Sequence, residues 1–135
     1  MIDRLQIERL LLALYAARVR GDRDAVCRLF SDGAKFEIAG ASHASPIAVK
    51  AIGAEEFRPL LTLMIKTFKL SDYQILSMII ESPKAAVHWS AKVQSRITGA
   101  TVPTELVDLI EVNSSDRIVS YTEFFVPRHN RGVTA

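Results

Sequence analysis

The sequence has one cysteine, no long apolar run and little net charge. It therefore does not fit the usual patterns of disulfide-rich, membrane-spanning or nucleic-acid-binding proteins. Its single cysteine, Cys27, has no second cysteine with which to form an internal disulfide. No stretch reaches the roughly 18 apolar residues of a membrane-spanning helix. Charged residues interrupt the leucines near the N-terminus, unlike the apolar core of a secretory signal. We therefore expect a cytoplasmic protein that makes no use of a membrane.

The net charge of the sequence is also small. Lys and Arg number 17 and Asp and Glu number 15, which gives a formal net charge of only +2. No basic stripe interleaved with aromatic residues occurs, and the basic residues 128–131 are too few to form a groove. Nucleic acid is therefore not an expected partner.

The sequence lacks the usual motifs of metal, nucleotide and serine-hydrolase sites. His43, His88 and His129 are far apart, without an i, i+4 pair or a nearby cluster of ligands. No glycine-rich phosphate loop or Gly-x-Ser-x-Gly elbow is present. Cys27 is flanked by apolar residues and is interpreted as a small buried hydrophobe. We expect neither a metal nor a cofactor.

What is present fits one folded domain over residues 1–135. Hydrophobic residues make up 49% of the chain and charged residues 24%, which is close to the globular norm. A chain of this length can remove about two-thirds of its unfolded surface from water.

The first third of the sequence predicts two helices. Residues 3–20 have helical periodicity, with an apolar face made of Leu5, Leu11, Leu12, Tyr15 and Val19. The side chains expected to face solvent are Arg4, Glu8, Arg18 and Arg20. Gly21 is expected to end this helix and Asp22 to cap a short second helix over residues 25–30.

A strand pair and a third helix are expected next. Residues 34–39 alternate, so Phe36 and Ile38 share one face and Glu37 takes the other. A short strand over residues 47–50 would make a loose hairpin with them. Residues 53–69 have helical spacing, with Phe57, Leu60, Leu61, Met64 and Phe68 positioned for burial.

The rest of the sequence alternates as strands over residues 73–81, 85–98, 105–112 and 118–126. Short turn segments between long strands predict an antiparallel meander. Helices grouped ahead of a meander predict an α+β fold.

Alternation also assigns the faces of this sheet. Val87, Trp89, Ala91 and Val93 form an inner face, from which His88 points away. The next strand continues the inner face with Leu106, Asp108, Ile110 and Val112, and the last strand with Val119, Tyr121, Glu123 and Phe125. The opposite face still holds Val107, Leu109, Ile118, Phe124 and Val126. We interpret it as the interface of a homodimer; the alternative is a set of scattered surface hydrophobes.

Two carboxyl groups are candidates for chemistry on periodicity alone. Asp108 lies among apolar neighbours, which raises the pKa of a carboxyl and makes it a hydrogen-bond donor near neutral pH. The alternative is a structural acid that bonds a neighbouring amide or hydroxyl. Glu123 shares its face with Tyr121 and can serve as an inward base; the alternative is a salt bridge at the rim or the dimer interface.

Several segments resemble nuclear transport factor 2-like proteins, a superfamily with ketosteroid isomerase-like and SnoaL-like members. They are residues 10–22, residues 29–36 with the run Leu-Phe-Ser-Asp-Gly-Ala-Lys-Phe, residues 53–57 and residues 116–118. The resemblance covers nearly the whole chain as element order. It implies a cone-shaped, curved, mostly antiparallel sheet, with three helices from the N-terminal half enclosing an apolar pocket.

The resemblance to ketosteroid isomerases also implies site residues. Tyr15, which alone would be interpreted as a core residue, matches their helix-one tyrosine, and Asp108 matches their protonated acid. The position of their base falls on Ile38, while Glu37 points away, so Glu123 is the candidate replacement. The residues expected to line the pocket are Phe36, Ile38, Phe57, Leu61, Trp89, Ala91, Val93, Leu106, Ile110, Tyr121 and Phe125.

Two functions follow as hypotheses. The first is an isomerase, cyclase or dehydratase-like enzyme that acts on a small apolar carbonyl compound. Tyr15 and Asp108 would polarise the carbonyl, and Glu123 would be the base. The second is a non-catalytic module that binds a hydrophobic ligand or dimerises, which the loss of the base at Ile38 favours.

Overall fold

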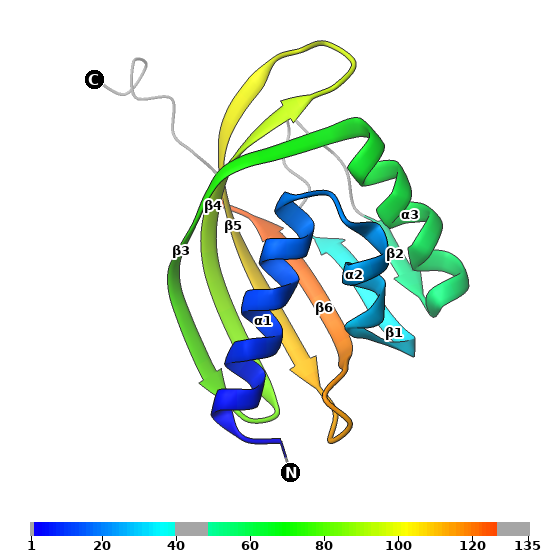
Figure 1. Ribbon diagram of the computed structural model, residues 1–135, viewed down its shortest axis with the longest axis vertical. Coiled ribbons are helices and arrows are strands. Elements are labelled where there is room, and N and C mark those ends of the chain that lie inside the picture. Colours follow the sequence, from blue (N-terminus) through cyan, green and yellow to red (C-terminus); the bar gives the residue numbers. More distant parts are fainter. Residues whose placement is uncertain (1, 40–48, 127–135) are drawn as a thin grey trace.

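The chain runs as two helices, a strand pair, a third helix and four long strands, in the order that the sequence predicts (Figure 1). The computed structural model describes residues 2–39 and 49–126. Their elements are α1 (Arg4–Val19), α2 (Arg23–Arg28), β1 (Phe30–Ala39), β2 (Val49–Ile52), α3 (Ala54–Thr67), β3 (Phe68–Glu81), β4 (Lys84–Ser95), β5 (Thr101–Val112) and β6 (Ile118–Phe125). His43, the first half of the strand expected at residues 47–50, and the basic tail with His129 lie outside the described residues.

The ends of α1 and α2 are set by local hydrogen bonds. Asp3 caps α1 by accepting from the Gln6 amide at 2.8 Å, and the Gln6 side chain accepts from the Asp3 amide at 3.0 Å. Gly21 ends the helical turn with φ +71°, a conformation that favours glycine. Asp22 then caps α2 by accepting from the Ala25 amide at 3.0 Å, as predicted.

The strands form one curved, unclosed sheet in the order β2-β1-β6-β5-β4-β3. The last four strands are the predicted antiparallel meander, and β1 joins it by pairing parallel to β6. Figure 1 shows α1 lying across one face of this sheet, with α2 beside it and α3 on the far side of α2, near β1 and β2. Within the described ranges, no helix is long and apolar enough to cross a membrane.

The inner face follows the predicted alternation. Val87, Trp89, Leu106 and Ile110 are all nearly or fully buried beneath α1 and its neighbours. The prediction for β6 was wrong at its first residue. The register shifts between Glu111 and Val112, so Ile118 pairs with Val112 and is fully buried on the inner side.

Three other sequence predictions need correction. Leu5 and Leu12, expected in the core, are 53% and 47% exposed on α1. Phe68, expected at the buried end of the third helix, begins β3 and is 39% exposed. Phe30, expected to end the second helix, begins β1, which therefore starts four residues before the expected strand at residues 34–39.

Candidate functional site

Six side chains from four elements meet between α1 and the inner face of the sheet. We call them the buried polar cluster: Tyr15 and Arg18 on α1, Trp89 on β4, Asp108 on β5, and Tyr121 and Glu123 on β6. Tyr15 and Arg18 are three residues apart and therefore share a helix face. Asp108 and Glu123 are direct partners in the β5–β6 register, so their side chains leave the sheet side by side.

Asp108 is the centre of the cluster and is 0% exposed. Its Oδ2 atom accepts from the Tyr15 hydroxyl at 2.5 Å and from the Trp89 indole N–H at 2.8 Å. The Tyr121 hydroxyl donates to the same atom. Oδ1 is also buried, and no donor from the described residues reaches it. Oδ2 therefore accepts hydrogen bonds from three donors, whereas Oδ1 accepts none from the described residues.

Burial raises the pKa of Asp108 well above its ordinary value of 3.8, and the nearby charge of Glu123 raises it further. The positive charge of Arg18 and the hydrogen bond from Tyr121 oppose this shift without cancelling it. Donors on Oδ2 favour a carboxylate, but complete removal from water is the larger effect. Asp108 thus holds its proton at a pH where an exposed aspartate has lost it.

The pKa of Glu123 is shifted in the opposite direction, below its ordinary value. Burial alone would raise the pKa of Glu123, but the charge and hydrogen bond of Arg18 lower it below 4.5. The Arg18 Nη1 atom lies 2.5 Å from Glu123 Oε2, and the two side chains are only 10% and 2% exposed. Arg18 Nη1 also donates to the Tyr121 hydroxyl at 2.9 Å. The guanidinium lies 5.1 Å from the centre of the Trp89 ring, a cation–π distance. This makes Arg18–Glu123 a buried ion pair beside a carboxyl group whose pKa is raised.

The structure therefore brings together the three predicted site residues, Tyr15, Asp108 and Glu123. Their arrangement differs from the expected one in one respect. The Tyr15 hydroxyl is directed onto Asp108 itself, so the two donors do not converge on an open point between them. Glu123 is inward and 1% exposed, and it forms a salt bridge, as the alternative expected, but with Arg18 in the interior and not at an exposed rim.

Arg18 is the residue of the buried polar cluster that the sequence interpretation missed. It was expected to face solvent because an arginine on an amphipathic helix usually does. Two features of the sequence indicate that Arg18 is buried. It lies one helical turn after Tyr15, and an inward Glu123 needs a cation as its partner. An inward carboxylate without a partner would be strongly unfavourable.

Most of the residues expected to line a pocket are packed in the core, and two of them, Trp89 and Tyr121, belong to the buried polar cluster. Those that are buried are Phe36, Ile38, Phe57, Leu61, Trp89, Ala91, Leu106, Ile110 and Tyr121. The Phe36 ring stacks on the Tyr121 ring at 5.4 Å with 6° between their planes. Val93 is half-buried, and Phe125 at the end of β6 is 42% exposed.

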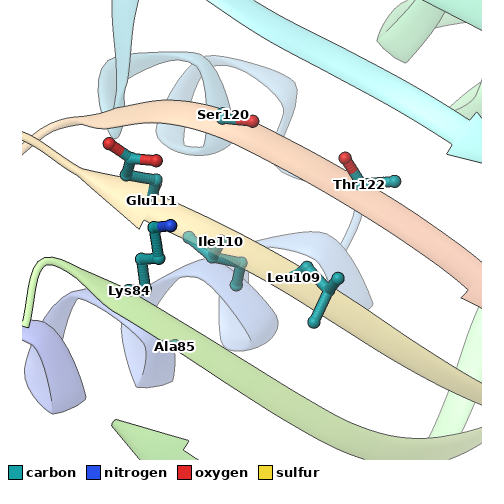
Figure 2. Close-up of a pocket in the computed structure, with 7 residues that line it drawn as sticks. All are labelled: Lys84, Ala85, Leu109, Ile110, Glu111, Ser120 and Thr122. Carbon is teal, nitrogen blue, oxygen red and sulfur yellow. The ribbon is translucent and has the colours of Figure 1, made fainter. Parts of the chain in front are cut away.

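A separate shallow hollow of about 250 Å³ lies on the outer side of the sheet. Figure 2 shows its lining: Lys84, Ala85, Leu109, Ile110, Glu111, Ser120 and Thr122. Leu109 and Thr122 alternate with Asp108 and Glu123, so the hollow opens on the face opposite the cluster. Among the described residues, no group of three His, Cys, Asp or Glu side chains is placed to hold a metal ion.

A family model and several solved structures match the sequence and fold of this chain. The model of the SnoaL-like domain matches residues 11–121, and no curated protein matches the chain. A protein from Bacillus subtilis described as a candidate isomerase has a TM-score of 0.81, with 19% identity over 94% of this chain and 91% of that one. An LEH-like epoxide hydrolase from M. tuberculosis has a TM-score of 0.73, with 17% identity over 90% of this chain and 84% of that one.

A ketosteroid isomerase-like protein from Erwinia carotovora atroseptica has a TM-score of 0.68, with 18% identity over 90% of this chain and 95% of that one. At these identities the solved structures establish a shared fold and leave the reaction open. The superfamily expected from the sequence is confirmed.

Proposed function

Because the chain belongs to the SnoaL-like domain family, we propose that it is an isomerase-type enzyme that moves a proton within a small apolar carbonyl compound. Asp108 is the proton donor to the carbonyl oxygen, and Glu123 is the base that takes a proton from the neighbouring carbon. In this proposal, both proton transfers are made by amino-acid side chains and need no cofactor.

The observation that carries this proposal is the difference in partners between two neighbouring buried carboxyl groups: Glu123 pairs with Arg18, whereas the described donors to Asp108 are uncharged. The pKa of Asp108 is raised by burial, whereas the pKa of Glu123 is lowered by Arg18 despite its burial. Such a pair supplies an acid and a base at the same pH, which is the usual requirement of general acid–base catalysis.

The surrounding groups define the kind of substrate. Glu123 with a lowered pKa is a weak base, so the C–H bond must already be acidic, as in a β,γ-unsaturated ketone. Tyr15, Trp89 and Tyr121 hold the acid in place by donating to Oδ2. The rest of the environment is aliphatic and aromatic, which suits an apolar molecule.

A direct test follows the isomerisation of a β,γ-unsaturated cyclohexenone to its conjugated isomer by ultraviolet absorbance. We expect Asp108→Asn and Glu123→Gln each to lower kcat/KM by about 100-fold or more, since each removes one half of the acid–base pair. Glu37→Gln is the matched control, because Glu37 lies on the outer face of β1. Wild-type protein that accelerates neither isomerisation nor deuterium exchange at the α-carbon would refute the proposal.

A second candidate is a non-catalytic module that holds a hydrophobic ligand. It is favoured by the Tyr15 hydroxyl, which is directed onto Asp108 and not toward an open space, and by the near-complete burial of the cluster. Saturable binding of the cyclohexenone without turnover, unaffected by Glu123→Gln, would support this candidate over the enzyme.

We further propose that the outer face of the sheet binds a second copy of the chain. Leu109 and Ile79 on this face are 48% and 66% exposed, and Val107 and Phe124 beside them are half-buried. The hollow there carries one charge of each sign, Lys84 and Glu111, so a two-fold axis can pair each with its opposite. Apolar area with balanced charge suits self-association.

Light scattering coupled to size exclusion tests the dimer. Leu109→Arg should give a monomer, because it places a charge in the middle of the apolar face. Leu12→Arg is a close control, since Leu12 is 47% exposed but lies on α1. A monomeric wild type at concentrations of about 100 μM would refute the interface.

A further inference from the structure

The Tyr121 hydroxyl lies between the two carboxyl groups and contacts both. It donates to Asp108 Oδ2 and also lies 3.2 Å from Glu123 Oε2, within donor range. A phenol has a single O–H proton, so it can donate to only one of these acceptors at a time. Arg18 Nη1 occupies an acceptor site of the same oxygen at 2.9 Å. The hydroxyl is thus poised to turn between Asp108 and Glu123.

The other tyrosine of the cluster lacks this position. Tyr15 donates to Asp108 Oδ2 at 2.5 Å, and the described residues show no hydrogen bond between Tyr15 and Glu123. Both tyrosines are 0% exposed and both contact the acid. They differ in whether they also contact the base, which makes them a natural pair for comparison.

We propose that the Tyr121 hydroxyl returns protons from Glu123 to Asp108, so that the site can complete a dehydration of a β-hydroxy ketone as well as an isomerisation. This inference rests on the proposed function, because it assigns a path between the acid and the base named there. Within the dehydratase-like activity expected from the sequence, it names β-hydroxy ketones as the substrates.

The proton balance shows why dehydration needs such a path. Glu123 carboxylate takes the α-proton, the C–H electrons form the new C=C bond, and the C–OH bond breaks. The Asp108 carboxyl gives its proton to the departing hydroxide, which leaves as water. Glu123 is then protonated and Asp108 ionised, the reverse of the starting state. An isomerisation, by contrast, returns each proton to its donor within the turnover.

Tyr121 can reverse this change in one concerted step. The Glu123 carboxyl gives its proton to the Tyr121 oxygen, while the Tyr121 O–H proton passes to the Asp108 carboxylate. The side chains of Asp108 and Glu123 are nearly free of solvent contact, which limits the exchange of their protons with bulk water. The competing path is a direct hydrogen bond between the two carboxyl groups, which are cross-strand neighbours.

The experiment is rapid mixing of enzyme with the aldol adduct of benzaldehyde and acetone, whose dehydration to benzylideneacetone is seen by absorbance. Tyr121→Phe should form one product equivalent per active site in a burst and then turn over about 100-fold more slowly. Tyr15→Phe should lose rate in the first turnover without gaining a burst. The Phe36 stacking on the ring is retained in Tyr121→Phe, and circular dichroism checks that both variants fold.

The outcomes separate this inference from the proposed function. With the β,γ-unsaturated cyclohexenone, Tyr121→Phe should show no burst, because that reaction needs no return of the proton. A wild type that dehydrates the adduct while both tyrosine variants give the same progress curve would overturn the relay alone. A wild type that converts neither probe would overturn the proposed function and the relay together.

Discussion

Removing the charge of Arg18 provides the strictest test of the buried polar cluster. Arg18→Met keeps a long apolar stem but leaves the Glu123 carboxylate, whose side chain is 2% exposed, without its cation. Breaking a buried ion pair in this way costs about 3–5 kcal/mol, because a desolvated charge remains without compensation. That is a large part of the roughly 5–15 kcal/mol by which a domain of ordinary stability is folded.

The loss should depend on pH in a defined direction. In the wild type the folded pKa of Glu123 lies below 4.5, so its stabilising contribution is present above that pH and is lost as the pH falls through the folded pKa. Without Arg18, burial becomes the dominant influence and raises the folded pKa above the unfolded one. The variant then loses stability as the pH rises through that window. The difference between the two proteins should grow from about pH 4 to pH 7.

Urea unfolding at both pH values, followed by the fluorescence of the single tryptophan, measures this difference. The double variant Arg18→Met with Glu123→Gln should recover most of the loss at pH 7, because no unpaired charge remains. A coupling energy between the two sites below about 0.5 kcal/mol would show that they do not interact in the folded protein. Equal stability of wild type and Arg18→Met at both pH values would refute the assignment of a buried ion pair.

Three further predictions concern the same core. The fluorescence of Trp89, whose indole donates to Asp108, should titrate with a midpoint above 3.8, and Asp108→Asn should abolish that transition. Asp108→Asn should match the wild type in stability below pH 3.8 and exceed it as the pH rises, because the native state no longer has to keep a raised-pKa acid neutral. Urea unfolding at neutral pH should therefore show Asp108→Asn to be more stable than the wild type. A thiol-reactive dye should label Cys27 only after denaturation, since burial raises the pKa of its thiol and leaves the residue 7% exposed.

Most of the fold could be predicted because its periodicities are local. Alternation over β4 and β5 identified the inner face, and glycine and aspartate marked the step between α1 and α2. The boundary between α3 and β3 was missed because no glycine or proline separates Thr67 from Phe68, and an apolar residue fits either pattern. The flip of Ile118 was missed because a shift in register depends on the partner strand, not on the residue itself.

The candidate site was predictable in part for the same reason. Asp108 and Glu123 were recognised as inward because their strand neighbours are apolar, and the structure makes them direct cross-strand partners. Arg18 could not be assigned from helical spacing, since its burial depends on Glu123, which lies 105 residues further along the chain. The direction of the Tyr15 hydroxyl likewise depends on contacts across two layers, which no short stretch of sequence contains.

The division of the cluster between two layers has a consequence for how it could open. The sheet supplies Trp89, Asp108, Tyr121 and Glu123, while the last two turns of α1 supply Tyr15 and Arg18. A small outward tilt of the C-terminal end of α1 would move Tyr15 away from Asp108 and Arg18 away from Glu123 at the same time. The acid would then lose a partner, the base would gain strength, and room for a substrate would appear between them. Admission of a molecule and activation of the site would be one event.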